Sequence, residues 1–528
     1  MNCTNFQMTF TMFFLTSYFL LSCILIFFTI NGKILSYSKK PPLPPGPFSW
    51  PIVGNIPQVY TNKPVFKWIH RVIEKMKTNI VRFRIGRVNI IVVVSPELSR
   101  EFLHKHDSVF MSRPITMATE YASGGFLTTG LSPSGEQWKK MKRIVNQELY
   151  SPTRFRWLLN KRNEEIDNLV YYIFKRCNNP DGSVINLNLP IKHYGPNVIR
   201  KTTFSRRFYG KGGENGGPGF EEKQHVHALY TVLKYTFAFC ISDYMPWLRC
   251  LDVGSHEKYV RNSMNVFNKY HDPIIEDRIK QWEDGKKSEP EDLLDIMITL
   301  KDESGKPLLS IDEIKAQCCE FFFGVDGPAA GTEWALAEMI NQPEILQKAV
   351  EEIDRVVGKD RWIQESDVHQ LNYLKACARE AFRLHPHAPF NLPHLSLADI
   401  EVGGYFIPKG SHVLLSRIGL GRNPETWEEP LKYNPERHLS GNVSKVDLSE
   451  PNLRFLTFSI GKRACTGQTI GTILTIMALG RLIQGFAWSV PPSQEKIDLS
   501  TLEDLSLAKP LHAHARPCLD EAMYPVAP

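Results

Sequence analysis

Cys465 has surroundings that are unusual for a structural thiol. It is one of ten cysteines and lies in the segment FSIGKRACTG, residues 458–467, directly before a long apolar stretch with helical periodicity. The start of a helix stabilises a thiolate, because the helix dipole and the free backbone N–H groups favour negative charge there. The ten cysteines form no CxxC pair and no cluster with histidines, which argues against a zinc site or a disulfide framework.

The neighbours of Cys465 indicate what such a thiolate could bind. Gly461 permits a tight turn that brings backbone donors to the sulfur, and Gly467 would let a flat ligand approach the helix closely. Phe458 can shield the sulfur from water, and Arg463 can hold an anion. A single thiolate in a dry loop with many donors suits a haem iron that needs one strong axial ligand. An isolated cysteine is more commonly a buried structural thiol, but these neighbours argue against that alternative.

The segment matches all five defining positions of FxxGxRxCxG, so the chain resembles the cytochrome P450 haem-thiolate monooxygenases. The ExxR motif of that family stands upstream at Glu380 and Arg383, where the i, i+3 spacing places both charges on one helix face. The segment NPERH, residues 434–438, follows in the family's order. The resemblance implies that Glu380, Arg383 and Arg437 form a buried charge network with a structural role.

The resemblance also implies which residues hold the cofactor, a haem b whose iron takes Cys465 as its axial ligand. Trp138 and Lys142 stand at i, i+4, where the family binds a haem propionate with tryptophan and arginine. Lysine is a point charge and lacks the bidentate fork of arginine. His394 occupies another propionate-binding position. Electrons are expected from NADPH through NADPH–cytochrome P450 reductase, which docks in this family on the side of the basic run at 139–143.

Residues 323–334, FGVDGPAAGTEW, correspond to the oxygen side of the site. Most members of the family carry an acid followed by a threonine, and these two residues relay protons. Asp326 supplies the acid here, but Gly327 and Pro328 follow it. Pro328 is expected to interrupt the helical hydrogen bonds and to free a carbonyl. Thr332, one turn later, is a candidate hydroxyl. Asp326, Pro328 and Thr332 are therefore the candidate catalytic residues.

Longer segments resemble one subgroup, the plant amino-acid N-hydroxylases. The matching segments include NVIRK (197–201), FCISDYMPWL (239–248), EWALAEMINQPE (333–344) and GSHVLLSRIGLGRNP (410–424). The resemblance implies conversion of an L-amino acid to its (E)-aldoxime by two successive N-hydroxylations with O2, in plant pathways such as glucosinolate, cyanogenic glucoside or volatile oxime biosynthesis. Two segments depart from the subgroup. Its Asp-Asn-Pro-Ser-Asn appears here as residues 326–330, DGPAA, and residues 466–468, TGQ, are closer to the general family.

The substrate pocket is expected to be rich in phenylalanine, which suits an apolar side chain, aliphatic or aromatic. The candidate lining residues are Phe126, Phe237, Phe323 and Phe390. Arg113 and Arg417 are candidates for the cation that holds the substrate carboxylate, although either could equally serve the haem propionates or the fold.

Three alternatives remain open. The first is a cytochrome P450 with another activity, such as C-hydroxylation. The second is a haem-thiolate isomerase or dehydratase that needs no reductase, against which Asp326, the basic run and the N-terminal apolar segment argue. The third is a haem-binding protein without turnover, because the oxygen-side motif is altered.

The elements that must position these residues are mostly helical. Apolar residues recur at i, i+3 and i+4 over 136–149, 155–177, 257–283, 311–341, 343–357, 371–385 and 466–486. Strand patterns occur at 80–95 and 400–415. The sequence therefore predicts a mainly α fold with a small β-sheet region, the cytochrome P450 fold. The glycine-rich run 210–219 is expected to be a surface loop.

The N-terminus predicts a membrane anchor. Residues 8–30 contain no charged side chain and are long enough to span a bilayer core of about 30 Å. The first lysines follow this segment, which places the rest of the chain in the cytosol. We expect a single-pass protein of the endoplasmic reticulum membrane with a basic, proline-rich linker at 31–47 and one catalytic domain at 48–528. The net charge of +7 is too diffuse to indicate nucleic-acid binding.

Overall fold

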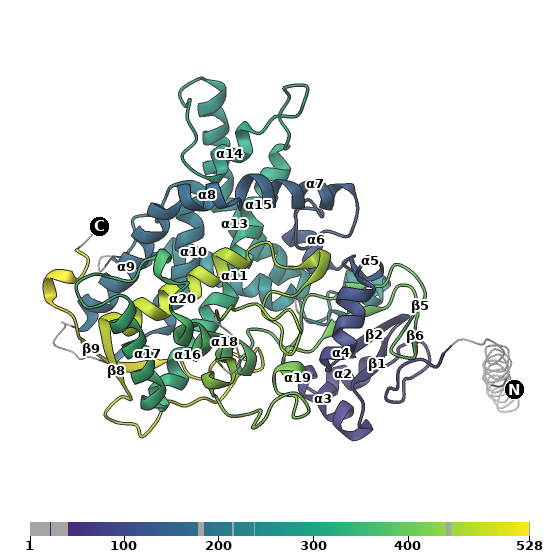
Figure 1. The fold of residues 1–528 in the computed structure, drawn as a ribbon. Helices are drawn as coiled ribbons and strands as arrows, with labels where there is room; N and C mark the ends of the chain where they lie inside the picture. Colours follow the sequence, from purple (N-terminus) through teal and green to yellow (C-terminus); the bar gives the residue numbers. More distant parts are fainter. Residues whose placement is uncertain are drawn as a thin grey trace, which may run out of the picture.

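The computed structural model describes Ser22 and residues 41–177, 184–213, 216–236, 238–439 and 445–526. A large body of helices occupies most of the molecule, and small sheets lie at its margins (Figure 1). Except for Ser22, the predicted anchor at 8–30 lies outside the described residues. The described part of the predicted linker, residues 41–47, has no regular structure. Among the described residues, no helix has the length and apolar character needed to cross a membrane.

A group of helices around one apolar core forms the centre of the fold. These helices are α9 (Leu159–Cys177), α10 (Asn188–Phe204), α16 (Asp326–Asn341), α17 (Pro343–Val356), α18 (Asn372–Leu384) and α20 (Gln468–Gly485). Helix α20 packs against α9, α16, α17 and α18 and runs through the middle of the molecule (Figure 1). A helix that is surrounded by protein needs apolar residues on all sides, and α20 has buried residues on every turn after its first.

A second cluster of buried apolar side chains lies between a different set of helices. It involves α6 (Met117–Ala122), α7 (Glu136–Ile144), α11 (Phe220–Thr236), α13 (His256–Glu283), α14 (Leu293–Thr299) and α15 (Ile311–Phe323). The shorter helices are α2 (Ile56–Thr61), α3 (Val65–Met76), α4 (Pro96–Arg100), α5 (Asp107–Phe110), α8 (Pro152–Trp157), α12 (Ile241–Tyr244) and α19 (Arg417–Gly421).

The main sheet carries one of the predicted cofactor residues. Its strands are β1 (Ile80–Ile85), β2 (Val88–Val93), β7 (His412–Leu415) and β4 (His394–Leu395), in that order. The pairs β1–β2 and β4–β7 are antiparallel, and β2–β7 is parallel. The remaining sheets consist of β3 (Val184–Asn186), β9 (His512–Pro517) and β8 (Phe486–Ser489), and of β5 (Ile400–Val402) with β6 (Tyr405–Ile407).

The predicted mainly α fold with small sheets is confirmed, and the described residues of the glycine-rich run form a loop as expected. The helices predicted at 257–283, 343–357, 371–385 and 466–486 agree with α13, α17, α18 and α20 to within two residues at each end. Two long helices, α10 and α11, were not predicted because they are buried on several sides and have no single apolar stripe.

Three predicted helices are interrupted. The helix predicted at 136–149 is α-helical only to Ile144 and continues as a wider turn to Leu149. The one at 155–177 is split at Leu158. The prediction of a single helix at 311–341 is wrong, because this region forms two helices, α15 and α16, that are separated at residues 324–325.

The interruption at 324–325 precedes Pro328 instead of falling at it. Pro328 is the third residue of α16. Proline has no N–H to offer the carbonyl four residues earlier, but the first turn of a helix has no intrahelical partners for its N–H groups anyway. The chain therefore leaves the helix at Gly324 and starts a new one in which Pro328 is tolerated.

Candidate active site

A cavity of about 310 Å³ lies where α7, α15, α16 and the loop before α20 meet. Its walls also include apolar side chains such as Phe321, Val325, Phe382 and Leu392. The cavity brings together residues that are far apart in the sequence. The predicted site residues that line it are Trp138, Lys142, Phe323, Asp326, Pro328, His394, Phe458, Arg463, Cys465 and Gly467.

The loop before α20 fixes the position of Cys465. The backbone N–H of Cys465 donates to the carbonyl of Phe458 at 2.9 Å. Gly461 begins the short helical turn between them with a φ of +77°, and a Cβ there would lie 2.6 Å from the carbonyl oxygen of Leu103. Both the conformation and the close approach require glycine. Gly461 itself does not line the cavity.

The sulfur of Cys465 opens into the cavity. Burial raises the pKa of this thiol, and the backbone N–H of Gly467 and the charge of Arg417 oppose that rise only in part. A Cβ at Gly467 would lie 3.7 Å from the sulfur and 3.4 Å from Ile470. The thiol therefore has an uncrowded approach but needs a bound cation to remain a thiolate.

Trp138 lies between two cations at one end of the cavity. The guanidinium carbon of Arg463 is 4.1 Å from the centre of the Trp138 ring, and the Lys142 ammonium is 5.2 Å from it. Lys142 also donates to the carbonyl of Lys462. Arg463 donates to the carbonyl of Ser132 at 2.8 Å. These contacts hold positive charge against the cavity wall.

Arg113 and His394 add to this basic end. Arg113 donates to the carbonyls of Leu392 and Pro393 at 2.8 and 3.0 Å. Burial, together with the neighbouring charge of Arg463, lowers the pKa of Arg113 to about 9. His394 makes a 2.8 Å hydrogen bond from Nδ1 to the carbonyl of Phe110, and burial holds its pKa well below the ordinary value. In this neutral form Nε2 is an acceptor, so His394 would have to be protonated to bind an anion.

Arg417 makes fewer hydrogen bonds than Arg113. One of its terminal nitrogens donates to the carbonyl of Leu456 at 3.0 Å, while its buried Nε has no partner among the described residues. Burial lowers the pKa of Arg417 to about 10, and the nearby Cys465 and Asp326 oppose this change. Arg417 therefore keeps donor capacity in the cavity wall.

The start of α16 provides the acid. Asp326 lines the cavity, and burial raises the pKa of its carboxyl group to about 7. Thr332 lies elsewhere: its hydroxyl donates to the carbonyl of Pro328 at 2.9 Å, and the residue does not line the cavity. This bond satisfies the only O–H of Thr332, so the structure does not place the predicted hydroxyl beside Asp326.

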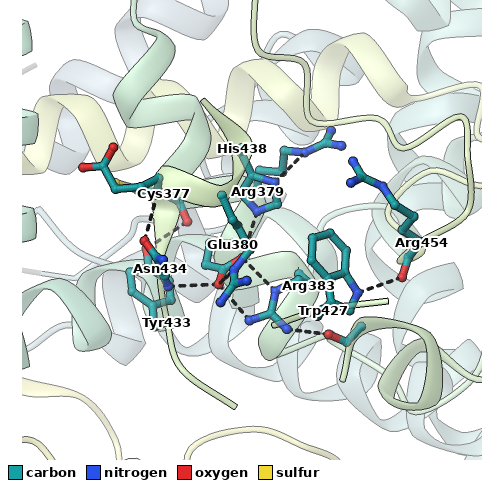
Figure 2. A network of polar contacts seen from close by, with 12 residues as sticks. Cys377, Arg379, Glu380, Arg383, Trp427, Tyr433, Asn434, His438 and Arg454 are labelled. Atoms are coloured by element: carbon teal, nitrogen blue, oxygen red, sulfur yellow. Dashed lines mark hydrogen bonds and ion pairs between the residues drawn. The ribbon is translucent and has the colours of Figure 1, made fainter. Parts of the chain in front are cut away.

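Glu380 is the centre of the predicted charge network (Figure 2). Arg383 donates to both of its oxygens at 2.7 Å, and Arg437 donates at 2.9 Å. His438, which was not predicted, makes a further contact at 2.8 Å. Burial alone would raise the pKa of Glu380, but the hydrogen bonds and charges of Arg383 and His438 lower it to about 2. The network ties α18 to the segment 434–438.

A second buried pair extends this network. Arg379, one turn before Arg383 on α18, forms an ion pair with Glu450 and contacts Nδ1 of His438 at 3.2 Å (Figure 2 labels Arg379 and His438). Neither residue of this pair was predicted. Arg379 stands one position before Glu380 of the ExxR motif, but its partner lies about 70 residues away and no local pattern connects them.

Residues 44–515 match the sequence pattern of the family described as Cytochrome P450. The chain belongs to the cytochrome P450 family. This cytochrome P450 is 52% identical over 516 residues to a tryptophan N-monooxygenase of Prunus mume, with 96% of each chain covered. It is 50% identical over 527 residues to isoleucine N-monooxygenase 1 of Lotus japonicus, which covers 99% of this chain and 97% of the relative.

Solved structures show the same fold. A zebra fish cytochrome P450, described as a structure with progesterone, superposes on this cytochrome P450 with a TM-score of 0.69. The superposition covers 87% of this chain and all of the zebra fish chain, at 21% sequence identity. This likeness concerns the fold alone.

The cavity of this cytochrome P450 fits the haem that its family holds through a cysteine thiolate. Cys465 presents a sulfur with an open approach, and Gly467 leaves room beside it. At the basic end, the charges of Arg113 and Arg463 disfavour each other's burial, which an anionic carboxylate group would offset. The residues present therefore suit an iron ligand and propionate groups.

Two of the predicted pocket phenylalanines lie elsewhere. Phe390 packs under the main sheet and stacks on His70, with ring centres 6.2 Å apart. Phe126 has a φ of +69° in the loop after α6 and does not line the cavity. Phe323 lines it, and Phe237 lies outside the described residues. The sequence-based reasoning missed His387, which lines the cavity from the segment after α18.

Proposed function

We propose that this protein is an amino-acid N-monooxygenase that converts an L-amino acid to its (E)-aldoxime by two successive N-hydroxylations, using O2 and electrons from NADPH. The observation that carries this proposal is the identity of 50 to 52% over nearly the whole chain to relatives named as N-monooxygenases of tryptophan and isoleucine. These relatives differ in the side chain that their names specify, so the similarity supports the class of substrate and leaves the particular amino acid open.

The residues of the cavity suit this chemistry. A thiolate-ligated haem, when bound, supplies oxygen activation. Cys465 would hold its iron, and Trp138, Arg113 and Arg463 would hold its propionates. Asp326 carries a proton near neutral pH because its pKa is raised to about 7, so it can hand a proton to a water in the cavity.

The substrate needs a place for its carboxylate in a largely apolar cavity. We propose Arg417 for this role, because its Nε has no partner among the described residues, whereas Arg113 lies near Arg463 at the basic end that suits the propionates. The aromatic and aliphatic walls, including Phe323 and Leu392, would contact an apolar side chain.

We further propose that the protein is anchored in the endoplasmic reticulum membrane by residues 8–30 and receives electrons from NADPH–cytochrome P450 reductase. The basic side chains on α7 support a docking face for an acidic partner. Arg143 is exposed, and Lys139 is exposed with only a surface ion pair to Glu136.

The test is to express the chain with a plant reductase and supply a panel of L-amino acids. The expected result is a substrate-induced shift of the haem spectrum, NADPH consumption that depends on one or a few amino acids, and an oxime detected by mass spectrometry. A C-hydroxylated product, or turnover without NADPH, would support another cytochrome P450 activity. Absence of a spectral shift and of an oxime across the panel would overturn the proposal.

A further inference from the structure

His387 is a polar side chain of the cavity wall that the chemistry above does not use. It belongs to the segment between α18 and β4, and its ring lines the cavity. Its Nδ1 is buried and has no hydrogen-bond partner among the described residues. Leaving a buried polar atom unpaired is unfavourable, so such atoms generally meet a water or a ligand.

Gly327 leaves space next to this nitrogen. A Cβ at Gly327 would lie 3.5 Å from Nδ1 and 3.6 Å from Cε1 of His387, in ordinary van der Waals contact with this edge of the ring. Gly327 belongs to α16 and has no positive φ, so its backbone conformation does not require glycine. The absence of a side chain at 327 therefore leaves the Nδ1 edge of the His387 ring without a methyl group against it.

The surroundings of His387 keep its ring neutral. Burial, followed by the charge of Arg417, holds the pKa of His387 well below its ordinary value. Asp326, which is adjacent to Gly327 in the chain, and Arg417 line the same cavity. An acid, a neutral imidazole and a cation are therefore available to a ligand in this cavity, apart from the basic end described above.

We propose that His387 accepts a hydrogen bond through Nδ1 from the nitrogen of the bound amino acid, in the space that Gly327 leaves open. This inference rests on the proposed function. Hydroxylation at nitrogen requires the uncharged amine, because an ammonium group has no lone pair. A carboxylate in this position would favour the ammonium form, whereas a neutral imidazole can hold an N–H group of the free amine without favouring a positive charge on it.

The test uses the haem-containing enzyme and measures binding by spectral titration. The ligands are L-tryptophan or L-isoleucine, whichever shifts the wild-type spectrum more, and the matching carboxylic acid that lacks the amino group. In His387→Val the Kd for the amino acid is expected to rise about tenfold, the loss of one hydrogen bond, while the Kd for the deamino acid changes less than about twofold. His387→Asn, whose amide can reach the position of Nδ1, is expected to recover most of the affinity.

Gly327→Ala supplies a second variant. Its Cβ fills the space beside Nδ1, so it is expected to weaken amino-acid binding in the wild type but to add nothing in the His387→Val background. His412→Val is the matched control, because His412 is buried on β7 near Tyr244 and does not line the cavity. An unchanged reduced carbon-monoxide spectrum shows that each variant retains its haem site.

Two results would overturn the inference. One is a His387→Val enzyme that binds the amino acid as tightly as the wild type, and the other is an equal loss for the amino acid and the deamino acid. If no amino acid shifts the wild-type spectrum, the proposed function fails first and the inference fails with it. Amino-acid binding by the wild type therefore separates the two failures.

Discussion

Cys465 lies in a wall where burial raises its pKa more than Gly467 and Arg417 lower it. The thiolate form of Cys465 is therefore stabilised when its sulfur is bound to a cation such as the haem iron. We expect Cys465→Ser to lose the reduced carbon-monoxide absorbance that is typical of the family, because a serine hydroxyl is a far weaker ligand. Cys250→Ser, at an exposed free cysteine, is the matched control and is expected to keep the absorbance. An intact thiolate-type spectrum in Cys465→Ser would contradict the assignment.

Asp326 makes the stability of the fold depend on pH. Its pKa is raised from 3.8 to about 7 by burial, so the unfolded chain ionises this group before the folded protein does. Stability is therefore lost as pH rises from about 4 to about 7, by an amount on the order of 4 kcal/mol. Urea unfolding of the haem-containing protein should show this loss relative to Asp326→Asn, with a constant difference above pH 7. Parallel pH profiles for the two proteins would contradict the buried, protonated state.

At the scale of residues, the sequence predicted the surroundings of Cys465 because they are local. Gly461, Arg463 and Gly467 act within a few positions of the cysteine. The sequence could not predict that the Phe390 side chain packs outside the cavity, because the His70 ring on which it stacks belongs to a distant segment of the chain. The sequence suggested Thr332 as a hydroxyl near Asp326, but it could not show where the hydroxyl points. A threonine in a helix can donate to the carbonyl one turn earlier, as Thr332 does to Pro328.

Among the elements, the interruption between α15 and α16 shapes the oxygen side of the cavity. Pro328→Ala restores an N–H that can bond the carbonyl of Gly324 and favours one continuous helix. We expect the variant to lose about 0.5–1 kcal/mol in the free energy of unfolding, because proline in the first turn of a helix restricts the unfolded chain and alanine does not. We also expect it to bind the amino acid more weakly, because a continuous helix would change the cavity wall at Asp326. Urea unfolding and spectral titration measure both effects. Unchanged binding together with unchanged stability would show that the interruption does not depend on Pro328.

The Glu380 network locks α18 to the segment 434–438. Glu380→Gln removes the charge shared by the buried Arg383 and the partly exposed Arg437, so we expect a loss of about 3 kcal/mol or more in the free energy of unfolding. The pKa of about 2 adds a pH dependence: the stability due to Glu380 is present above the unfolded value of 4.5 and is lost as pH falls toward 2.

The control for this network is Glu97→Gln, which breaks an exposed ion pair with Arg100 and is expected to change stability by less than about 0.5 kcal/mol. Equal effects of the two variants in urea unfolding would show that burial adds nothing to the Glu380 contacts.

The periodicity of apolar residues predicted the amphipathic helices α13, α17 and α18 well. It failed for α10 and α11 because helices buried on several sides have no apolar stripe to detect. The sequence also placed one helix across Gly324, where the apolar pattern continues although the hydrogen bonds do not.

At the scale of the whole molecule, the sequence predicts attachment to a membrane. Residues 8–30 predict an integral anchor by length and composition alone. We expect the full chain to resist alkaline extraction from microsomes and a variant without residues 8–30 to be extracted. Both proteins should show the same reduced carbon-monoxide spectrum, because no described residue of the cavity comes from that segment. Extraction of the full chain, or retention of the shortened one, would contradict an anchor at 8–30.

The residues that line the cavity lie between positions 113 and 474, a span of about two thirds of the chain. During translation, Cys465 is added only after nearly nine-tenths of the chain has been synthesised. Arg113 and Trp138 are added within the first third. Capture of the cofactor is therefore a late event in biosynthesis. A premature stop codon shortly before Cys465 would yield a long product with most of the cavity residues but without the cysteine, and such a product is expected to be removed by cellular quality control.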